Sequence, residues 1–367
     1  MRAGALPALF QEKARFSARI ACVNTRPRTQ VRRKGKAMIV ACGESLIDMV
    51  PAEHGSNLFE ACPGGCPYNS AIAAARLGAP TWFLGKTSRD FLGDTIASKL
   101  VNSGVDVSLL ARSDQAVTLA FVERDQAGNA KYAFYSADAA DRFFLPSDIP
   151  AELPGNSVFL LVGSISLVQE PSRSTILALI EREHERKLIS FDPNVRPNLI
   201  SSKSEYHARF ELICQRSAIV KASDSDLEWL YECPADEAAN KVLGLGPELV
   251  ALTKGEHGSL ALTKHVRIEM PAVKVGVVDT IGAGDSFHAG LLAALGWLKV
   301  RNRKDLASLS EQNLRAVLKL ATSVAALDCT KRGAEPPTLH ELAVFDPEAV
   351  LIAPGIIPQF NAKERIC

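Results

Sequence analysis

The residues with the clearest chemical meaning lie at 279–285, where the chain reads DTIGAGD and then continues as an apolar stretch of helical character. Small residues at a helix start leave backbone N–H groups uncovered, so a phosphate can approach them closely. The positive end of the helix dipole strengthens that attraction. Asp285 repels a resting phosphate, so a loop that only binds phosphate gains nothing from it. Its place is explained if the carboxylate takes a proton from an attacking hydroxyl, which predicts a phosphoryl-transfer centre.

Such a loop must be positioned by a larger framework, and the chain alternates segments typical of strands and helices. Short apolar runs predict strands at 38–43, 81–84, 157–162 and 188–191. Helical patterns cover 69–77, 94–102, 172–187, 285–298 and 312–327. The alternation predicts a mainly parallel sheet with helices on both faces.

Two segments, about 48–60 and 115–137, do not fit this alternation. The second contains two alternating runs around the turn sequence DQAGN at 125–129, which predicts a β-hairpin. We expect both segments to form a small β lid.

Composition limits the function classes. The 367 residues carry a formal net charge of +1, which gives no support for nucleic acid or an anionic membrane as a partner. No apolar run approaches the length of roughly 18–20 residues that a membrane span needs. The eight cysteines are scattered, and we expect reduced thiols in the cytoplasm. Cys62 and Cys66 lack a second pair of suitable spacing, which argues against zinc.

The first 37 residues differ from the rest, with ten Lys or Arg against one acid, Glu12. We expect a disordered basic extension that catalysis does not need. Two origins stay open: a transit-type leader, or a start codon called too early, with Met38 opening the folded part. One folded domain is expected over 38–345, followed by a C-terminal tail at 346–367.

The segment at 279–285 resembles the C-terminal signature of the ribokinase-like (PfkB) family of sugar kinases, and PGGCPYN at 63–69 resembles its N-terminal signature. Within the family the chain is most similar to bacterial fructokinases, through CGE at 42–44, YAFY at 132–135 and DPNVR at 192–196. The resemblance implies a ribokinase-like three-layer α/β sandwich with a mainly parallel central sheet and a β lid. It also implies Asp285 as general base, with the backbone of Gly282, Ala283 and Gly284 steadying the moving phosphoryl group.

The sugar side of the site is implied at four positions near the N-terminus. Asp48 matches a family Asp that binds sugar hydroxyls, although alone it would be taken for a solvated turn residue. Gly64 and Gly65 would expose N–H groups to sugar oxygens. The amide of Asn69 can both donate and accept; its other role would be to cap the following helix, which is compatible with ligand binding.

Two arginines are further substrate candidates. Arg196 follows a predicted strand, at the sheet edge where open α/β folds bind ligands. It can bond sugar oxygens or a carboxylate, or form a surface ion pair. Arg142, after the lid hairpin, matches a lid segment of fructokinases.

The nucleotide side is implied by KASDSD at 221–226 and TKGEHG at 253–258. Asp226 stands where the family usually has Glu near magnesium, and a shorter acid would act through water. The second segment has a plain β-turn as its alternative. The implied contacts to ATP are Lys221, Ser223, Thr253, Gly255, Gly258, Gly282 and Gly284. Asp279, the Ile281 carbonyl and Gly333 match a K⁺ site of family members.

The predicted function is therefore transfer of the γ-phosphoryl of ATP, with Mg²⁺, to a sugar hydroxyl, with fructose as the expected sugar. The alternatives are 2-keto-3-deoxygluconate kinase or another sugar or nucleoside kinase of the family, and, outside the enzymes, a catalytically silent sugar-binding protein. We also expect a homodimer formed through the lid. A dinucleotide-dependent dehydrogenase is disfavoured because GESLID follows the first strand in place of a glycine fingerprint.

Overall fold

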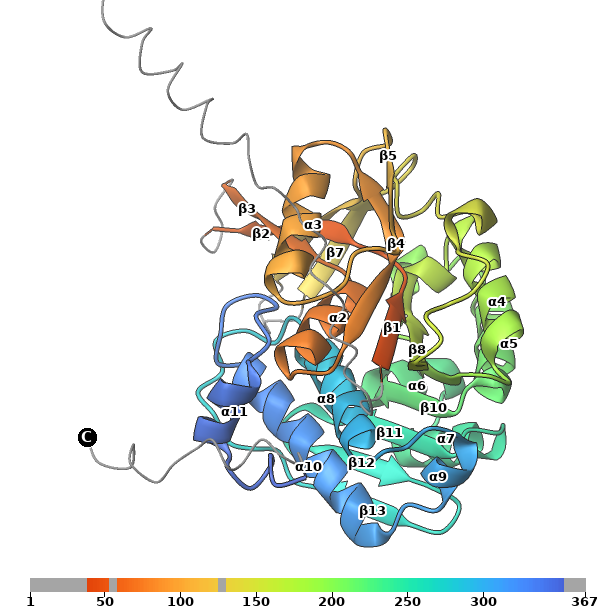
Figure 1. The fold of residues 1–367 in the computed structure, drawn as a ribbon, viewed down its shortest axis with the longest axis vertical. Coiled ribbons are helices and arrows are strands. Elements are labelled where there is room, and N and C mark those ends of the chain that lie inside the picture. Colours follow the sequence, from red (N-terminus) through yellow and green to blue (C-terminus); the bar gives the residue numbers. More distant parts are fainter. Residues whose placement is uncertain (1–37, 53–57, 125–129, 353–367) are drawn as a thin grey trace, which may run out of the picture. The chain divides into compact units, whose positions relative to one another are not determined.

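The computed structural model describes residues 38–52, 58–124 and 130–352 (Figure 1). They lie within one compact unit, Lys36–Cys367. The expected basic extension at 1–37, the hairpin turn at 125–129 and most of the C-terminal tail fall outside the described residues.

The central sheet has nine strands in the order β13-β12-β11-β10-β9-β8-β1-β4-β5. They are β1 (Met38–Cys42), β4 (Thr81–Ser88), β5 (Leu110–Ser113), β8 (Ser157–Gly163), β9 (Leu188–Asp192), β10 (Ile219–Ser223), β11 (Leu249–Thr253), β12 (Ser259–Leu262) and β13 (Arg267–Met270). Pairing is parallel from β11 to β5, and β12 and β13 add antiparallel at one edge. The mainly parallel sheet is confirmed.

Helices cover both faces because the strand residues are apolar on both sides. In β1, Ile39 and Ala41 join one core cluster, and Val40 and Cys42 join another. The first cluster includes α2 (Cys66–Arg76), α3 (Phe91–Asn102), α8 (Ala283–Trp297), α9 (Arg303–Ala307), α10 (Glu311–Asp328) and α11 (Leu339–Phe345). The second includes α4 (Ser172–Glu183), α5 (Lys203–Arg216), α6 (Asp224–Tyr231) and α7 (Ala235–Gly244). This gives the expected three layers.

The lid is a separate sheet of four strands in the order β3-β2-β6-β7. It consists of β2 (Leu46–Pro51), β3 (Phe59–Gly64), β6 (Leu119–Arg124) and β7 (Ala130–Tyr135). The predicted hairpin is confirmed as the antiparallel pair β6–β7. The two lid segments meet because β2 pairs with β6 in parallel.

The strand order reverses beside β1. The chain runs outward from β1 to β4 and β5, then returns to place β8 on the other side of β1. At such a switch point the loops after neighbouring strands diverge and leave a crevice at the carboxyl edge of the sheet, which is where open α/β folds bind ligands.

Some local predictions differ from the structure. Helix α2 begins at Cys66, with Gly65 as its N-cap. Asn69 therefore lies inside the helix, and its predicted capping role is wrong. Helix α4 ends at Glu183 rather than at 187. The pattern also did not single out α5, α7, α9 and α11.

Within the described residues, no helix is long and apolar enough to cross a membrane. The described cysteines are free thiols, as their scattered spacing predicts.

Candidate active site

A polar cavity of about 70 Å³ lies at the switch point. Its walls come from the loops after β1, β8 and β9, from the lid, and from the first turns of α2 and α8. The lining residues are Glu44, Leu46, Asp48, Gly65, Cys66, Asn69, Tyr132, Phe134, Ser164, Ile165, Asn194, Arg196, Ile281, Gly282 and Asp285. The structure thus brings together Asp48, Gly65, Asn69, Arg196, Ile281, Gly282 and Asp285 from the predicted set.

Two helices begin at this cavity without a side-chain cap. Gly282 is the N-cap of α8 and Gly65 the N-cap of α2, and neither helix start has a side-chain cap hydrogen bond. Both glycines have a positive φ, 84° at Gly282 and 117° at Gly65. A Cβ at Gly282 would lie 2.7 Å from the Ala334 Cβ. Both positions therefore require glycine, and the start of α8 offers N–H donors to the cavity. At the start of α2 the Cys66 N–H donates to the Glu44 side chain, and Pro67 has no N–H.

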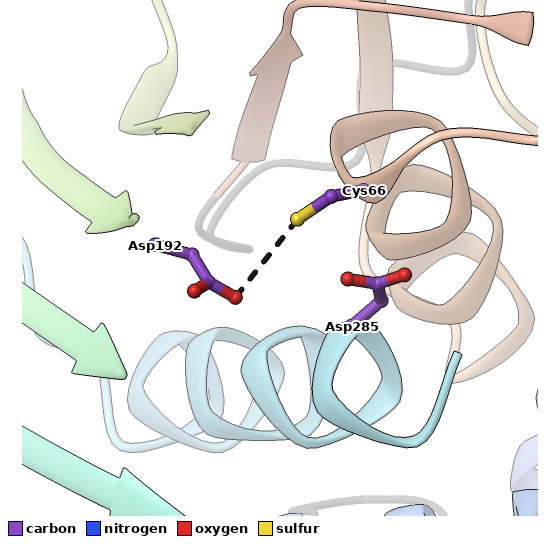
Figure 2. A group of neighbouring side chains, drawn as sticks. All are labelled: Cys66, Asp192 and Asp285. Atoms are coloured by element: carbon purple, nitrogen blue, oxygen red, sulfur yellow. Dashed lines mark hydrogen bonds between the residues drawn. The ribbon is translucent and has the colours of Figure 1, made fainter. Parts of the chain in front are cut away.

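Asp285 lies in the first turn of α8 and is 7% exposed. The Asn69 side-chain amide donates to its Oδ2 at 2.9 Å, and the Ser70 hydroxyl donates to its backbone carbonyl at 3.3 Å. Burial raises the pKa of Asp285 from 3.8 to about 6, with a further rise from Asp192, while hydrogen bonds from Cys66 and Asn69 lower it. Figure 2 shows Cys66, Asp192 and Asp285 converging from α2, β9 and α8. A carboxyl group with a pKa of about 6 is mostly ionised at neutral pH, so Asp285 can accept a proton there.

Asp48 faces the cavity from the lid strand β2. Burial raises its pKa to about 7, and the Arg196 guanidinium opposes this rise. A Cβ at Gly64 would lie 2.1 Å from the Asp48 Oδ2, so Gly64 makes room for this carboxylate. Gly64 itself does not line the cavity.

Arg196 lies with its guanidinium carbon 5.3 Å from the centre of the Tyr132 ring. Its Nη1 donates to the Asn194 and Val195 carbonyls. The predicted alternative, a surface ion pair, is not what the structure shows, because the half-buried side chain lines the cavity.

Asp226, which is predicted to act near magnesium through water, accepts hydrogen bonds from two backbone donors. Its Oδ1 accepts the Val195 N–H at 2.8 Å, and its Oδ2 accepts the Ser223 N–H at 3.0 Å. Ser223 in turn caps α6 by accepting the Asp226 N–H. With both oxygens bound to backbone donors, Asp226 ties the loop after β9 to the start of α6.

Of the predicted ATP contacts, Gly282 lines the cavity and the others lie outside its lining. Lys221 is buried in an ion pair with Asp192. Thr253 donates to the Ala222 carbonyl. A Cβ at Gly258 would lie 2.0 Å from the Met270 carbonyl oxygen, whereas Gly255 faces open space. Thr253 ends β11, and Gly255 begins the short 3-10 helix Gly255–His257 that follows, so both lie at the carboxyl edge of the sheet.

The three residues of the predicted K⁺ site do meet. The Asp279 Oδ1 accepts the Ile281 N–H at 3.1 Å, and its Oδ2 accepts the Gly333 N–H at 3.0 Å. Asp279 thus joins the loop before α8 to the loop after α10.

Arg142 does not reach the cavity. Its guanidinium donates to the backbone carbonyls of Glu170, Ser136 and Ala137. These bonds hold the loop that follows the lid hairpin, and the sugar contact of Arg142 stays a prediction.

Several lining residues were not predicted. Glu44 is 1% exposed and accepts N–H bonds from Cys66 and Ser166. Its position directly after the glycine that ends the first strand was a signal for it. Tyr132 and Phe134 stack at 5.7 Å between ring centres, and their spacing of two residues puts them on the same lid face.

The pfkB carbohydrate kinase model matches residues 36–341. The chain belongs to this family. A fructokinase of Rhizobium leguminosarum bv. trifolii is 40% identical over 281 residues, which cover 76% of this chain and 86% of that protein. Probable fructokinase-3 of Arabidopsis thaliana is 36% identical, over 84% of this chain and 91% of its own length.

Solved structures of the family agree. A double mutant of the Vibrio cholerae O395 fructokinase, bound to fructose, ADP and potassium ion, has a TM-score of 0.76 at 28% identity and covers 85% of this chain and 98% of its own. A fructokinase from Xylella fastidiosa with bound ATP has a TM-score of 0.78 at 26% identity, over 85% and 99%. This pfkB kinase is therefore an ATP-dependent enzyme that phosphorylates a sugar hydroxyl, on the predicted ribokinase-like fold.

The raised pKa of Asp285 predicts a stability effect that does not depend on turnover. Because its folded-state pKa of about 6 exceeds the ordinary value of 3.8, ionisation of Asp285 destabilises the fold as the pH rises through about 6. Asp285→Asn should therefore raise the free energy of unfolding by roughly 1–3 kcal/mol at about pH 8. The gain should shrink as the pH falls below about 6. Urea unfolding at several pH values measures both effects.

The matched control is Asp94→Asn, which changes another acid in the first turn of a helix, at a side chain 67% exposed. It should change the free energy of unfolding by less than about 1 kcal/mol. A stability gain at Asp285→Asn that does not vary with pH would contradict the burial account.

Proposed function

We propose that this pfkB kinase transfers the γ-phosphoryl of ATP to a hydroxyl of D-fructose, with Asp285 as the general base. The observation that carries the proposal is the place of Asp285, a buried carboxylate in the first turn of an uncapped helix that faces a polar cavity. The bacterial and plant fructokinases among its relatives support fructose as the sugar.

In this proposal Asp285 accepts the proton of the attacking hydroxyl. The amide of Asn69 holds the carboxylate oxygen Oδ2 at 2.9 Å, which leaves Oδ1 for the substrate. As the hydroxyl loses its proton, its oxygen bonds to the γ-phosphorus and the bond to the leaving ADP oxygen breaks. The protonated carboxyl is acceptable in this site because burial already favours the neutral form.

The start of α8 stabilises the charge that moves with the phosphoryl group. The N–H groups of residues 282–284 point from the uncapped helix end, and the helix dipole adds to their effect. The Ala283 N–H already makes a long contact of 3.3 Å with the Thr280 carbonyl, so Gly282 and Gly284 are the freer donors. We propose Mg²⁺ as the ion that accompanies ATP, where it neutralises phosphate charge. No direct ligand role falls to Asp226.

Sugar hydroxyls are bound by the polar wall opposite α8. Asp48 and Asn69 supply an acceptor and an amide, and Arg196 supplies donors beside the Tyr132 ring. The lid strands β2 and β7 carry Asp48 and Tyr132, so the lid helps to shield the transferred group from water, which would compete as acceptor.

One alternative has an observation in its favour. A guanidinium in the cavity would also pair with the carboxylate of 2-keto-3-deoxygluconate. The other alternative, a catalytically silent sugar-binding protein, is disfavoured. A buried carboxylate in the first turn of a helix raises the free energy of the folded state, and a protein that only binds sugar gains nothing in return.

Removing the general base tests the proposal. Asp285→Ala should lower turnover by roughly 10²–10⁴-fold, the usual contribution of a general base, with sugar affinity little changed. Asp94→Ala, in the first turn of α3 and outside the cavity, is the control and should retain full turnover. Near-normal turnover of Asp285→Ala would refute the role.

The sugar is identified by coupled ADP release with fructose, 2-keto-3-deoxygluconate, ribose and adenosine in parallel. Fructose should give the highest kcat/KM. Preference for another acceptor would replace fructose and keep the chemistry, whereas no ADP release with any acceptor would favour the binding protein.

We further propose that K⁺ binds beside Asp279, Ile281 and Gly333, which the structure brings together. A potassium ion is bound in the Vibrio cholerae relative. Turnover should be higher in K⁺ than in Na⁺ at equal ionic strength, and Asp279→Ala should abolish the difference. Equal rates of the wild type in both salts would exclude activation.

A homodimer through the lid is the last part of the proposal. Phe59, Phe121 and Tyr135 contact one another on the lid face opposite to Asp48 and Tyr132. Phe59 is 41% and Tyr135 66% exposed, an apolar surface that a second lid would cover. Sedimentation velocity should show a dimer that Phe59→Glu with Tyr135→Glu converts to a monomer. A monomeric wild type at micromolar concentration would exclude it.

A further inference from the structure

A buried ion pair lies beneath the cavity. The Lys221 Nζ is 2.8 Å from the Asp192 Oδ2, and the two side chains are 5% and 0% exposed. Asp192 ends β9 and Lys221 lies on the neighbouring β10, which places the pair at the carboxyl edge of the sheet. Neither residue lines the cavity, so neither is positioned to touch the sugar.

The pair lies next to the proposed general base. Carboxylate oxygens of Asp192 and Asp285 and the Cys66 Sγ all lie within 4.8 Å of one another (Figure 2). The Cys66 Sγ is 3.9 Å from the Asp192 Oδ2, so the thiol proton can be donated to either carboxylate. Two buried carboxylates so close would repel each other, and one would tend to take up a proton. Lys221 compensates the Asp192 charge and therefore favours ionised Asp285.

Lys221 also reaches the start of α8. A Cβ at Gly284 would lie 2.9 Å from the Lys221 Nζ. The ammonium group therefore lies directly under the first turn of the helix, in space that glycine leaves open. A fixed positive charge there adds to the helix dipole at the turn that is to stabilise the moving phosphoryl group.

His288, one turn further along α8, does not share this charge. Its Nε2 is 2.6 Å from the Ser190 hydroxyl, and its Nδ1 is 4.0 Å from the Asp192 Oδ2. Burial and the nearby Lys221 charge hold the pKa of His288 well below its usual value, so the ring is neutral. Burial alone would lower the pKa of Lys221, but Asp192 raises it above its ordinary value, so the cation is Lys221.

We propose that Lys221, anchored by Asp192, is a positioning residue of the phosphoryl-transfer centre, which keeps Asp285 ionised and holds one positive charge beneath residues 282–284. The inference rests on the proposed function of Asp285. A purely structural ion pair would stabilise the fold without affecting the protonation of Asp285.

Other groups bear on the same carboxylate and stay constant in the test. They are Cys66 and Asn69 from α2, Asp48 from the lid, Arg196 from the loop after β9, Tyr132 from β7, and Asp328 from α10.

Lys221→Met tests the inference through the pH dependence of turnover. Removing the cation leaves Asp192 uncompensated beside Asp285, so Asp285 ionises at higher pH. The acidic limb of kcat against pH should move upward by about one pH unit, and kcat on the plateau should fall roughly 10–10²-fold. KM for fructose should change less than about twofold, because Lys221 does not line the cavity. An unmoved acidic limb would overturn the inference, even if turnover fell.

The double variant Asp192→Asn with Lys221→Met removes both charges, so it avoids an unpaired buried ion if the single variant fails to fold. Its acidic limb should return towards the wild-type position, while kcat stays at least about tenfold lower because the positive charge is absent. Wild-type kcat in the double variant would overturn the inference.

Lys86→Met is the matched control. Lys86 and Asp148 form another ion pair, 3.0 Å long with side chains 11% and 16% exposed, and neither lines the cavity. This variant should keep the wild-type pH profile. An active Asp285→Ala would refute the proposed function itself, whereas inactive Asp285→Ala with an unchanged Lys221→Met profile would refute only this inference.

Discussion

The hydrogen bond from Asn69 to Asp285 joins two helix starts that are far apart in the chain, and the rest of the site depends on it. Both helices begin at glycines beside one cavity, and the first turn of α8 carries N–H donors without a side-chain cap. The two starts meet there because the strand order reverses beside β1 and opens a crevice at that edge. The fold thus places both helix starts at one crevice, and the hydrogen bond from Asn69 holds the Asp285 carboxylate there.

Several carboxylates of the site are buried close to one another. Asp48, Asp192 and Asp285 all lie near it, and burial raises the pKa of the first and the last. Two cations oppose this accumulation, Arg196 near Asp48 and Lys221 beside Asp192. Burying paired charges seldom stabilises a fold more than apolar packing would. Groups of buried charges with shifted pKa values are typical of functional sites, where the protonation state of a side chain matters more than its contribution to the stability of the fold.

The sequence predicted the parts of the site that local pattern controls. Apolar runs located the strands, and the glycine motif at 282–284 located the start of α8. Asn69 was misplaced as a cap because the helix begins three residues earlier at Cys66, where Pro67 was an available signal. The hydrogen-bond partners of Asp226 and Arg142 were not predicted, for another reason. Their side chains bond backbone groups that the chain brings close only after folding, and no local pattern reveals such partners.

One of the links between the lid sheet and the main body is a single residue. Strand β3 ends at Gly64 and helix α2 begins at Cys66, with Gly65 alone between them. The register of β3 against β2, which pairs Leu46 with Gly64, therefore also sets the depth at which α2 starts. A slip of one residue would turn every side chain of the slipped strand to the opposite face of the sheet. It would also move the first residue of α2 by roughly 3.3 Å along the direction of β3, which is the rise of one strand residue. The pairing of β3 with β2 thus sets the position of the first turn of α2. A substitution that shifted this pairing would change the shape of the cavity without replacing any residue that lines it.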